Sequence, residues 1–143
     1  TIGGHSPAAL QQALAHNAML SKGSLNAQEL EAINLAVSEA TGCDYCLAAH
    51  TMMAKRAGYS SEQIHALRRG EYPQDAHLDA LAKFVQTLVS TTGTLPEADV
   101  SDLRSAGFSD QQTIEIISAV SAILFTNMVN RVNDTVVDFP KAD

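Results

Sequence analysis

The sequence predicts an all-α protein, a compact bundle of about six to seven helices. Apolar residues recur every three or four positions in most segments, the spacing of one face of a helix. Capping patterns separate these segments, each with Ser or Asn followed three residues later by Glu or Gln. The alternating pattern of a β-strand is missing. The nearest match, residues 135–139, is weakened by Pro140.

The first helices have clear start and stop signals. Ser6 followed by Pro7 is typical of a helix start, and we expect this helix to run to about residue 21. Asn26 and Glu29 form the outline of a capping box for a second helix, which Gly42 ends. The apolar face of this second helix carries Leu30, Ile33, Val37 and Ala40.

The remaining helices are predicted from the same kinds of start and stop signals. Ser60 and Ser109 each begin a further capping box, Asp75 caps the helix that follows it, and Pro96 opens a short one. We therefore expect helices at about residues 43–58, 60–70, 75–88, 96–107 and 109–136.

The last of these helices is apolar on most sides, which predicts a place in the core or against a partner subunit. Its apolar residues are Ile114, Ile116, Ile117, Val120, Ile123, Leu124, Phe125, Met128 and Val132. The methionines are also expected to pack in the core, where such side chains fill gaps. They are Met19, Met52, Met53 and Met128.

Composition limits the classes of function. A chain of 143 residues predicts one domain, residues 1–143, with a sizeable core. The net charge of −7 argues against nucleic-acid binding, which needs clustered Lys and Arg. We expect no membrane partner, because no apolar run approaches the ~18 residues of a span. Residues 1–7 lack the features of a secretory signal, and two cysteines three apart cannot staple a secreted fold. We expect a cytoplasmic protein.

The chemistry is expected at Cys43, Cys46 and His50. In a helix these spacings place all three side chains on one face. Gly42 indicates that the helix opens at Cys43, where the helix dipole favours a thiolate. An imidazole one turn after Cys46 can accept its proton. Asp44 would oppose the thiolate only if its side chain pointed inward. The pattern therefore predicts a thiol–disulfide redox site.

Two other interpretations of these residues are open. Buried cysteines are usually small core side chains. The spacing C-x2-C-x3-H also supplies three zinc ligands, but a structural zinc site needs four and no fourth ligand is evident. We expect no metal and no cofactor. The other histidines, His5, His16, His65 and His77, have no partners at telling spacings and are expected at the surface or in caps.

The residues around this site resemble the alkylhydroperoxidase D family of the carboxymuconolactone decarboxylase superfamily. Residues 31–38 and 41–50 are similar to the family's core, in which a glutamate lies twelve residues before C-x2-C-x3-H. That glutamate falls on Glu31, which on its own would be an ordinary surface residue. Residues 130–140 also resemble the tail of the family's peroxidase-related branch.

The resemblance implies the family's helical fold and a thiol-dependent alkyl hydroperoxidase that assembles as trimers or hexamers. In that scheme Cys46 attacks an organic hydroperoxide and Cys43 resolves the product as a disulfide. Glu31 and His50 relay the proton, and a dithiol or lipoyl-type protein, or a peroxiredoxin, exchanges electrons with the site. One departure is Tyr45, where the best-known form of the site has histidine. Because tyrosine is a poor base at neutral pH, we expect Tyr45 to lie beside the reacting groups without taking the proton, and to lower the rate or change the substrate.

Three other functions stay open. A disulfide reductase or adaptor for a peroxiredoxin would use the same cysteines. A lactone decarboxylase would use histidine chemistry, and the intact cysteine pair counts against it. A non-catalytic assembly protein would use the apolar last helix as an interface.

Overall fold

The fold is that of a computed structural model, which describes residues 2–138 and 140–142. Within these residues there are eight helical elements and no strand, as the all-α prediction requires. The two ends of the predicted domain, and Phe139 in the segment closest to a strand pattern, lie outside the described residues. The helices are α1 (Ile2–His5), α2 (Pro7–Ser21), α3 (Ala27–Thr41), α4 (Asp44–Arg56), α5 (Ser61–Arg68), α6 (Ala76–Thr91), α7 (Glu97–Ser105) and α8 (Asp110–Asn133).

The predicted helix starts are confirmed. The Asn26 side chain accepts from the Glu29 N–H, and the Glu29 carboxylate accepts from the Asn26 N–H, each at 2.8 Å. The boxes that begin at Ser60 and Ser109 have the same reciprocal bonds. Each box satisfies two N–H groups that a helix start would otherwise leave unpaired.

The predicted end of the last helix is wrong. The last helix ends at Asn133 rather than near residue 136, because Asp134 takes a left-handed conformation with φ of +48°. Its backbone N–H bonds back to the last helical carbonyls, those of Asn130 and Arg131, and so closes the helix.

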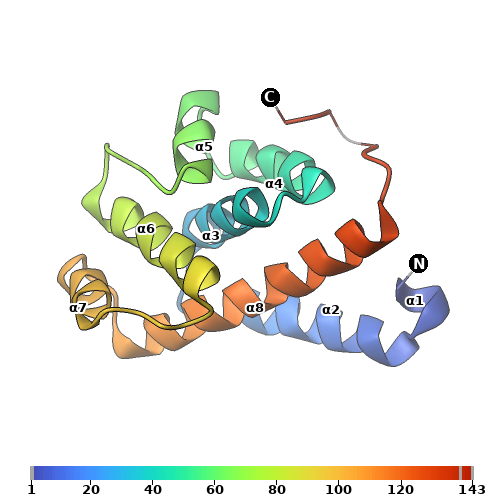
Figure 1. The fold of residues 1–143 in the computed structure, drawn as a ribbon, viewed down its shortest axis with the longest axis horizontal. Coiled ribbons are helices and arrows are strands. Elements are labelled where there is room, and N and C mark those ends of the chain that lie inside the picture. Colours follow the sequence, from blue (N-terminus) through green and yellow to red (C-terminus); the bar gives the residue numbers. More distant parts are fainter. Residues whose placement is uncertain (1, 139, 143) are drawn as a thin grey trace.

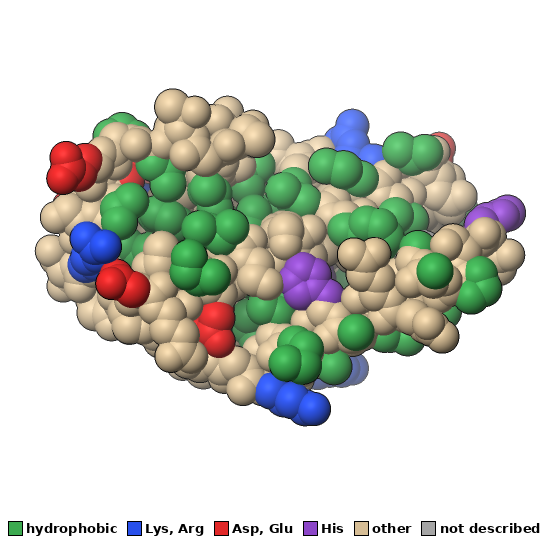
Figure 2. All heavy atoms as spheres, turned by 90° about the horizontal axis from the view of Figure 1, so that it is seen from below, with side chains coloured by type: hydrophobic (Ala, Val, Ile, Leu, Met, Phe, Trp, Pro, Cys, Tyr) green, Lys and Arg blue, Asp and Glu red, His purple; other side chains and the backbone are tan. Residues whose placement is uncertain are grey.

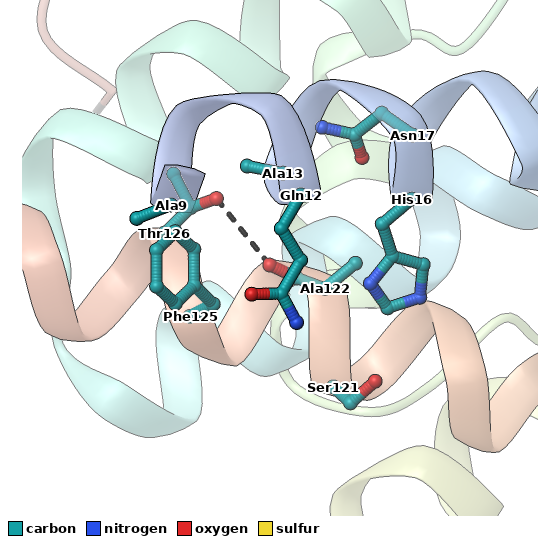
Figure 3. A pocket seen from close by; sticks show the side chains of 9 residues that line it. All are labelled: Ala9, Gln12, Ala13, His16, Asn17, Ser121, Ala122, Phe125 and Thr126. Carbon is teal, nitrogen blue, oxygen red and sulfur yellow. Dashed lines mark hydrogen bonds between the residues drawn. The ribbon is translucent and has the colours of Figure 1, made fainter. Parts of the chain in front are cut away.

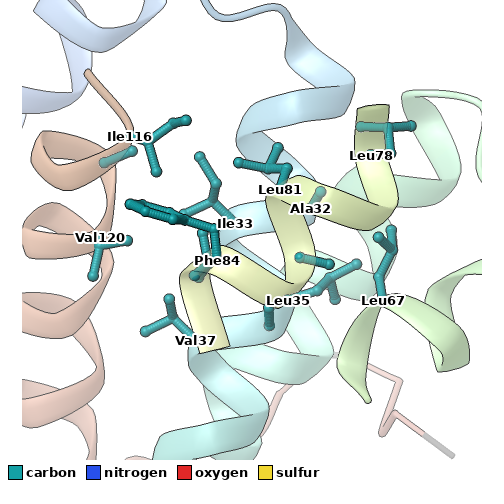
Figure 4. Close-up of a cluster of buried hydrophobic side chains, with 14 of the residues drawn as sticks. Ala32, Ile33, Leu35, Val37, Leu67, Leu78, Leu81, Phe84, Ile116 and Val120 are labelled. Atoms are coloured by element: carbon teal, nitrogen blue, oxygen red, sulfur yellow. The ribbon is translucent and has the colours of Figure 1, made fainter. Parts of the chain in front are cut away.

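Helix α3 is the centre of the molecule, with α4, α5, α6 and α8 packed around it (Figure 1). Its residues Ile33, Leu35 and Val37 are fully buried. Figure 4 shows them among apolar side chains from α5, α6 and α8. This core fixes both ends of α3, so the α3–α4 turn that carries the cysteines is held on a rigid support.

An ion pair between buried Glu29 and partly exposed His77 joins the start of α3 to α6, and His77 also contacts the α7–α8 turn. Glu29 is only 4% exposed, and its carboxylate lies 2.8 Å from His77 Nε2. His77 Nδ1 lies 2.7 Å from the Ala106 carbonyl, and the ring stacks on Phe108. Both acceptors need an N–H, so the ring carries a proton on each nitrogen. Burial lowers the pKa of His77, but the bonds to Glu29 and Ala106 outweigh it and the pKa lies above 6.5. His77 therefore has a partner that its spacing does not predict.

Helices α2 and α8 leave an uncharged face open to solvent. No side chain of α2 is buried, and Met19, Met53 and Met128 are each at least 45% exposed, so the prediction that the methionines fill the core is wrong for these three. Neither residues 7–21 nor residues 116–130 contain Asp, Glu, Lys or Arg. Figure 2 views this side, where charged side chains lie mostly toward the edges. We name the exposed side chains of residues 7–21 and 116–130 the uncharged face.

The total accessible surface of the chain is also larger than expected for its mass. It measures 7961 Å², whereas a folded monomer of 15.2 kDa typically has about 7,100 Å². The chain therefore exposes more surface than a typical folded monomer of its mass.

Helix α8 is long and apolar enough, by length and composition, to cross a membrane. One of its faces nevertheless packs into the core through Ile116, Ala119, Val120 and Ile123. A core helix passes the same test of length and composition, so the finding is weak evidence for a membrane span.

Candidate redox site

The turn between α3 and α4 places the cysteines at the start of a helix. Gly42 ends α3 with φ of +70°, a conformation that favours glycine. Cys43 is the N-cap of α4, and its sulfur accepts from the backbone N–H of Cys46 at 3.3 Å. The prediction that the motif opens a helix is confirmed. Asp44 is exposed, as expected for a side chain that faces water.

Cys43 and Cys46 form a disulfide within the first turn of α4, with Cα atoms 5.3 Å apart. That separation lies in the usual range for a disulfide. Both residues are buried, with exposed fractions of 2% and 1%. The first-turn N–H groups and the dipole of α4 favour negative charge at this position.

Glu31 and His50 form a second pair beside the disulfide. Glu31 on α3 lies 2.8 Å from His50 Nδ1 on α4, and both side chains are about 15% exposed. A carboxylate only accepts, so Nδ1 carries the proton and Nε2 is the nitrogen that can exchange one. Glu31 is thus an orienting group for His50 rather than a solvated surface residue. Among the described residues, no hydrogen bond joins His50 to Cys46 directly.

Helix α8 supplies polar contacts that the sequence analysis missed. Asn130 donates to Cys46 Sγ at 3.6 Å and to the Thr126 carbonyl at 3.0 Å. Asn127 is buried and bonds to Ser38 and Thr41 of α3. The available signal was the spacing of Asn127, Asn130 and Arg131 on a helix that is otherwise apolar, since i, i+3 and i+4 share one face.

Arg131 holds the end of α3. Its guanidinium donates to the carbonyl oxygen of Thr41 and, at 3.0 Å, to that of Gly42. These are among the carbonyls that a helix end leaves without an intrahelical partner. The same guanidinium lies over Gly42, where an added Cβ would be 2.7 Å from Nη1. The positive φ is what favours glycine at this position, and an added Cβ would also require the end of the Arg131 side chain to move.

A groove of about 350 Å³ leads to one of the two cysteines. It runs between the start of α4 and the end of α8, and Cys43 lines it but Cys46 does not. Its other lining residues are Gly42, Asp44, Tyr45, Asn130, Arg131, Asp134, Thr135 and Val137. Tyr45 therefore lines the same groove as Cys43. We name this space the Cys43 groove.

A second cavity, of about 240 Å³, lies between α2 and α8 (Figure 3). It is lined by neutral polar and apolar side chains, among them Gln12, His16 and Phe125. It contains no cysteine or carboxylate. Among residues 2–138 and 140–142, no three His, Cys, Asp or Glu side chains are arranged to hold a metal ion.

A comparison with protein-family models shows which family the residues of the redox site resemble. Residues 7–76, which include Glu31, both cysteines and His50, match the model of the carboxymuconolactone decarboxylase family. The chain contains a carboxymuconolactone decarboxylase family domain. The resemblance seen in the sequence is thereby confirmed. Comparison with curated proteins gives no significant match.

Solved structures share the fold of this carboxymuconolactone decarboxylase domain and of the helices after it. A protein of unknown function from Agrobacterium tumefaciens, suggested to be the antioxidant defence protein AhpD, is 21% identical. The two chains cover 98% and 97% of each other, with a TM-score of 0.86. An uncharacterized peroxidase-related protein from Ralstonia eutropha JMP134, described as an alkylhydroperoxidase AhpD core, is 22% identical with a TM-score of 0.81. The match covers 91% of this chain and 70% of that one.

The debrominase Bmp8, in a complex with 2,3,4-tribromopyrrole, has a TM-score of 0.80 at 18% identity. The match covers 94% of this chain and 73% of that one. At these identities the similarity concerns the fold. The AhpD-like helical fold predicted from the sequence is therefore confirmed, while the reaction is a separate question.

Proposed function

We propose that this protein is a thiol-dependent peroxidase that reduces organic hydroperoxides. The observation that carries the proposal is the Cys43–Cys46 bond in the first turn of α4, beside the Glu31–His50 pair. A thiol pair that closes into a disulfide supplies two electrons, and an oriented imidazole handles the protons of a peroxide.

The cycle begins with both cysteines reduced. The Cys46 thiolate attacks the terminal oxygen of ROOH, the O–O bond breaks, and ROH leaves with a proton relayed from His50. Cys46 is then a sulfenic acid. The Cys43 thiol attacks its sulfur, water leaves, and the disulfide forms. A dithiol returns two electrons and two protons. Glu31 keeps His50 in the tautomer that exchanges protons through Nε2.

A single-turnover assay tests this cycle. Reduced protein receives one equivalent of cumene hydroperoxide, and mass spectrometry follows the loss of two hydrogens from the cysteine pair. Cys43→Ser should stop at a sulfenic acid on Cys46 that dimedone traps. Cys46→Ser should consume peroxide no faster than buffer does. If Cys46→Ser reacts as fast as the wild type, the assignment of roles is wrong.

A matched pair of variants on α3 tests the relay. Glu31→Gln should slow peroxide consumption about 10²-fold or more, the usual contribution of a positioned acid–base group. Glu39→Gln makes the same change on the same helix, at a surface residue that pairs with Arg68. It should leave the rate unchanged. Equal effects of the two substitutions would contradict a specific role for Glu31.

The same assay separates the competing functions. A disulfide reductase or adaptor for a peroxiredoxin predicts slow reaction with peroxide and fast exchange with a protein disulfide. A lactone decarboxylase predicts activity that survives replacement of both cysteines. A non-catalytic assembly protein predicts thiols that peroxide barely touches in the folded state.

Reductive removal of bromine is a second candidate function. The fold shared with a debrominase favours it, and a thiol pair balances the reaction. One C–Br bond becomes C–H, bromide leaves, and the two thiols become the disulfide. Bromide release from tribromopyrrole by the reduced protein, faster than cumene hydroperoxide consumption, would favour this function over the peroxidase.

A further inference from the structure

We infer that Asn130 is a further catalytic residue of the redox site, which stabilises the Cys46 thiolate by a hydrogen bond from helix α8 to its sulfur. The inference deepens the proposed function and rests on it, because that function makes Cys46 the sulfur that attacks the peroxide. It assigns to one side chain the task of keeping Cys46 ionised when the disulfide is open.

Burial makes the ionisation of Cys46 unfavourable. The residue is 1% exposed, and removing a thiolate from water raises the pKa of the thiol. The attack on peroxide needs the thiolate, because the thiolate and not the thiol is the nucleophile. The proposed cycle therefore calls for a group that donates a hydrogen bond to this sulfur.

The start of α4 serves the other sulfur. Cys43 is the N-cap of this helix, and its sulfur accepts from the backbone N–H of Cys46 at 3.3 Å. Cys46 itself lies three residues further along, where the effect of the helix dipole is weaker. The local backbone alone would therefore make Cys43, rather than Cys46, the more acidic thiol.

Asn130 gives Cys46 a donor from a different helix. Its amide nitrogen lies 3.6 Å from Cys46 Sγ, although the two residues are 84 positions apart in the sequence. A hydrogen bond to the charged form of a group favours that form. Asn130 thus acts on Cys46 as the first turn of α4 acts on Cys43, and it does so without adding a charge to the site.

The orientation of the Asn130 amide is fixed. The amide also donates to the Thr126 carbonyl at 3.0 Å, which places its nitrogen rather than its oxygen on this side. An NH₂ group has two hydrogens, so one can serve Thr126 and the other Cys46. Asn127, one turn earlier, is buried and bonded to two side chains of α3. Because α3 leads directly into the cysteine turn, we expect the donor to keep its place when the disulfide opens.

The neighbouring titratable groups do not duplicate this donor. Arg131 donates to backbone carbonyls of the α3–α4 turn, and His50 pairs with the carboxylate of Glu31. The carboxylates of Asp44 and Asp134 line the Cys43 groove and disfavour a thiolate close to them. The full set around the turn is Glu31, Asp44, Tyr45, His50, Arg131 and Asp134.

Thiolate titration of single-cysteine variants tests the assignment. In Cys43→Ser, the ultraviolet absorbance of the Cys46 thiolate is followed against pH, with and without Asn130→Ala. Loss of a hydrogen bond to a charged group should raise the pKa of Cys46 by about one pH unit. Asn130→Asp adds a negative charge and should raise it further. In Cys46→Ser, Asn130→Ala should leave the pKa of Cys43 unchanged. Asn133→Ala is the matched control, because the Asn133 side chain donates to Thr135 rather than to a sulfur.

Alkylation of Cys43→Ser by iodoacetamide adds a kinetic measurement, in which the Cys46 thiolate displaces iodide. A pKa about one unit higher reduces the thiolate fraction about tenfold below the pKa, while a Brønsted slope of about 0.4–0.5 makes the thiolate about threefold more nucleophilic. Asn130→Ala should therefore react about threefold more slowly below the pKa and about threefold faster on the alkaline plateau. A general loosening of the site would instead speed alkylation at every pH.

Three results would overturn the inference. They are an unchanged pKa of Cys46 in both Asn130 variants, an equal shift at Cys43, and a Cys46 thiol that stays protonated until the protein unfolds. If Asn130→Ala does not fold, the isosteric Asn130→Asp decides. Neither measurement uses peroxide. If Cys46 fails to consume peroxide but its pKa shifts as expected, the proposed function is wrong and the bond from Asn130 to the thiolate stands.

Discussion

Replacement of His77 by Phe should destabilise the protein by an amount that depends on pH. Phe keeps the ring that stacks on Phe108 but removes both N–H donors, so the buried Glu29 carboxylate loses its cationic partner. A hydrogen bond between charged groups contributes about 1.5–3 kcal/mol. Because the His77 side chain is 34% exposed, solvent screens the pair and we take about 2 kcal/mol.

The size of this effect in a melting experiment follows from chain length. The entropy of unfolding is about 2.1 cal/mol/K per residue, which gives roughly 0.3 kcal/mol/K for 143 residues. A loss of about 2 kcal/mol then lowers Tm by about 7 °C.

The sign of the pH dependence follows from the pKa of His77, which the fold raises above its unfolded value of 6.5. The protonated ring is therefore favoured in the folded state. Its contribution is complete below pH 6.5 and is lost as the pH rises through the raised pKa. The difference in Tm between wild type and His77→Phe should be largest in mild acid and should shrink in alkali to what one remaining N–H supplies.

Thermal unfolding of both proteins from mild acid to mild alkali measures this difference. Glu29→Gln provides the control, because the cost of His77→Phe should lose most of its pH dependence when Glu29 is neutral. A difference in Tm that stays constant or grows with pH would refute the assignment of a doubly protonated His77.

Three further substitutions test other parts of the structure. Gly42→Ala places a Cβ 2.7 Å from Arg131 at a positive φ and should cost at least ~1–2 kcal/mol, seen as a lower Tm. Ile117→Glu puts a charge on the uncharged face, where we expect copies of the chain to associate. Light scattering should show a smaller species, and an unchanged mass contradicts the interface. Tyr59→Phe removes a 2.8 Å bond to the Gln28 carbonyl and should cost about 1 kcal/mol in denaturant unfolding.

The helices and the position of the cysteines could be predicted from local sequence signals. Capping boxes act within four residues, so Asn26 and Ser60 specify helix starts whatever surrounds them. Gly42 likewise predicts a left-handed residue at the end of its helix from the local sequence alone. The end of α8 was harder to predict because aspartate at position 134, unlike glycine, seldom has a positive φ.

Local sequence signals could not predict the contacts between residues that lie far apart in the sequence. Asn130 reaches Cys46 across 84 positions of sequence, and His77 reaches Glu29 across 48. Each pairing depends on how α8 or α6 packs on α3, which no periodicity encodes. Glu31 was identified only through the family pattern, and its pairing with His50 now gives that pattern a physical reason.

The capping of α3 by Arg131 also bears on the electric field at the sulfurs. The chain turns so tightly at Gly42 that the negative end of the α3 dipole lies next to the positive end of the α4 dipole. Left alone, these opposite partial charges would largely cancel at Cys43. The guanidinium of Arg131, bonded to the Thr41 and Gly42 carbonyls, neutralises the α3 end. We therefore expect Arg131 to leave the field of α4 less opposed, and so to act on the cysteines without touching either sulfur.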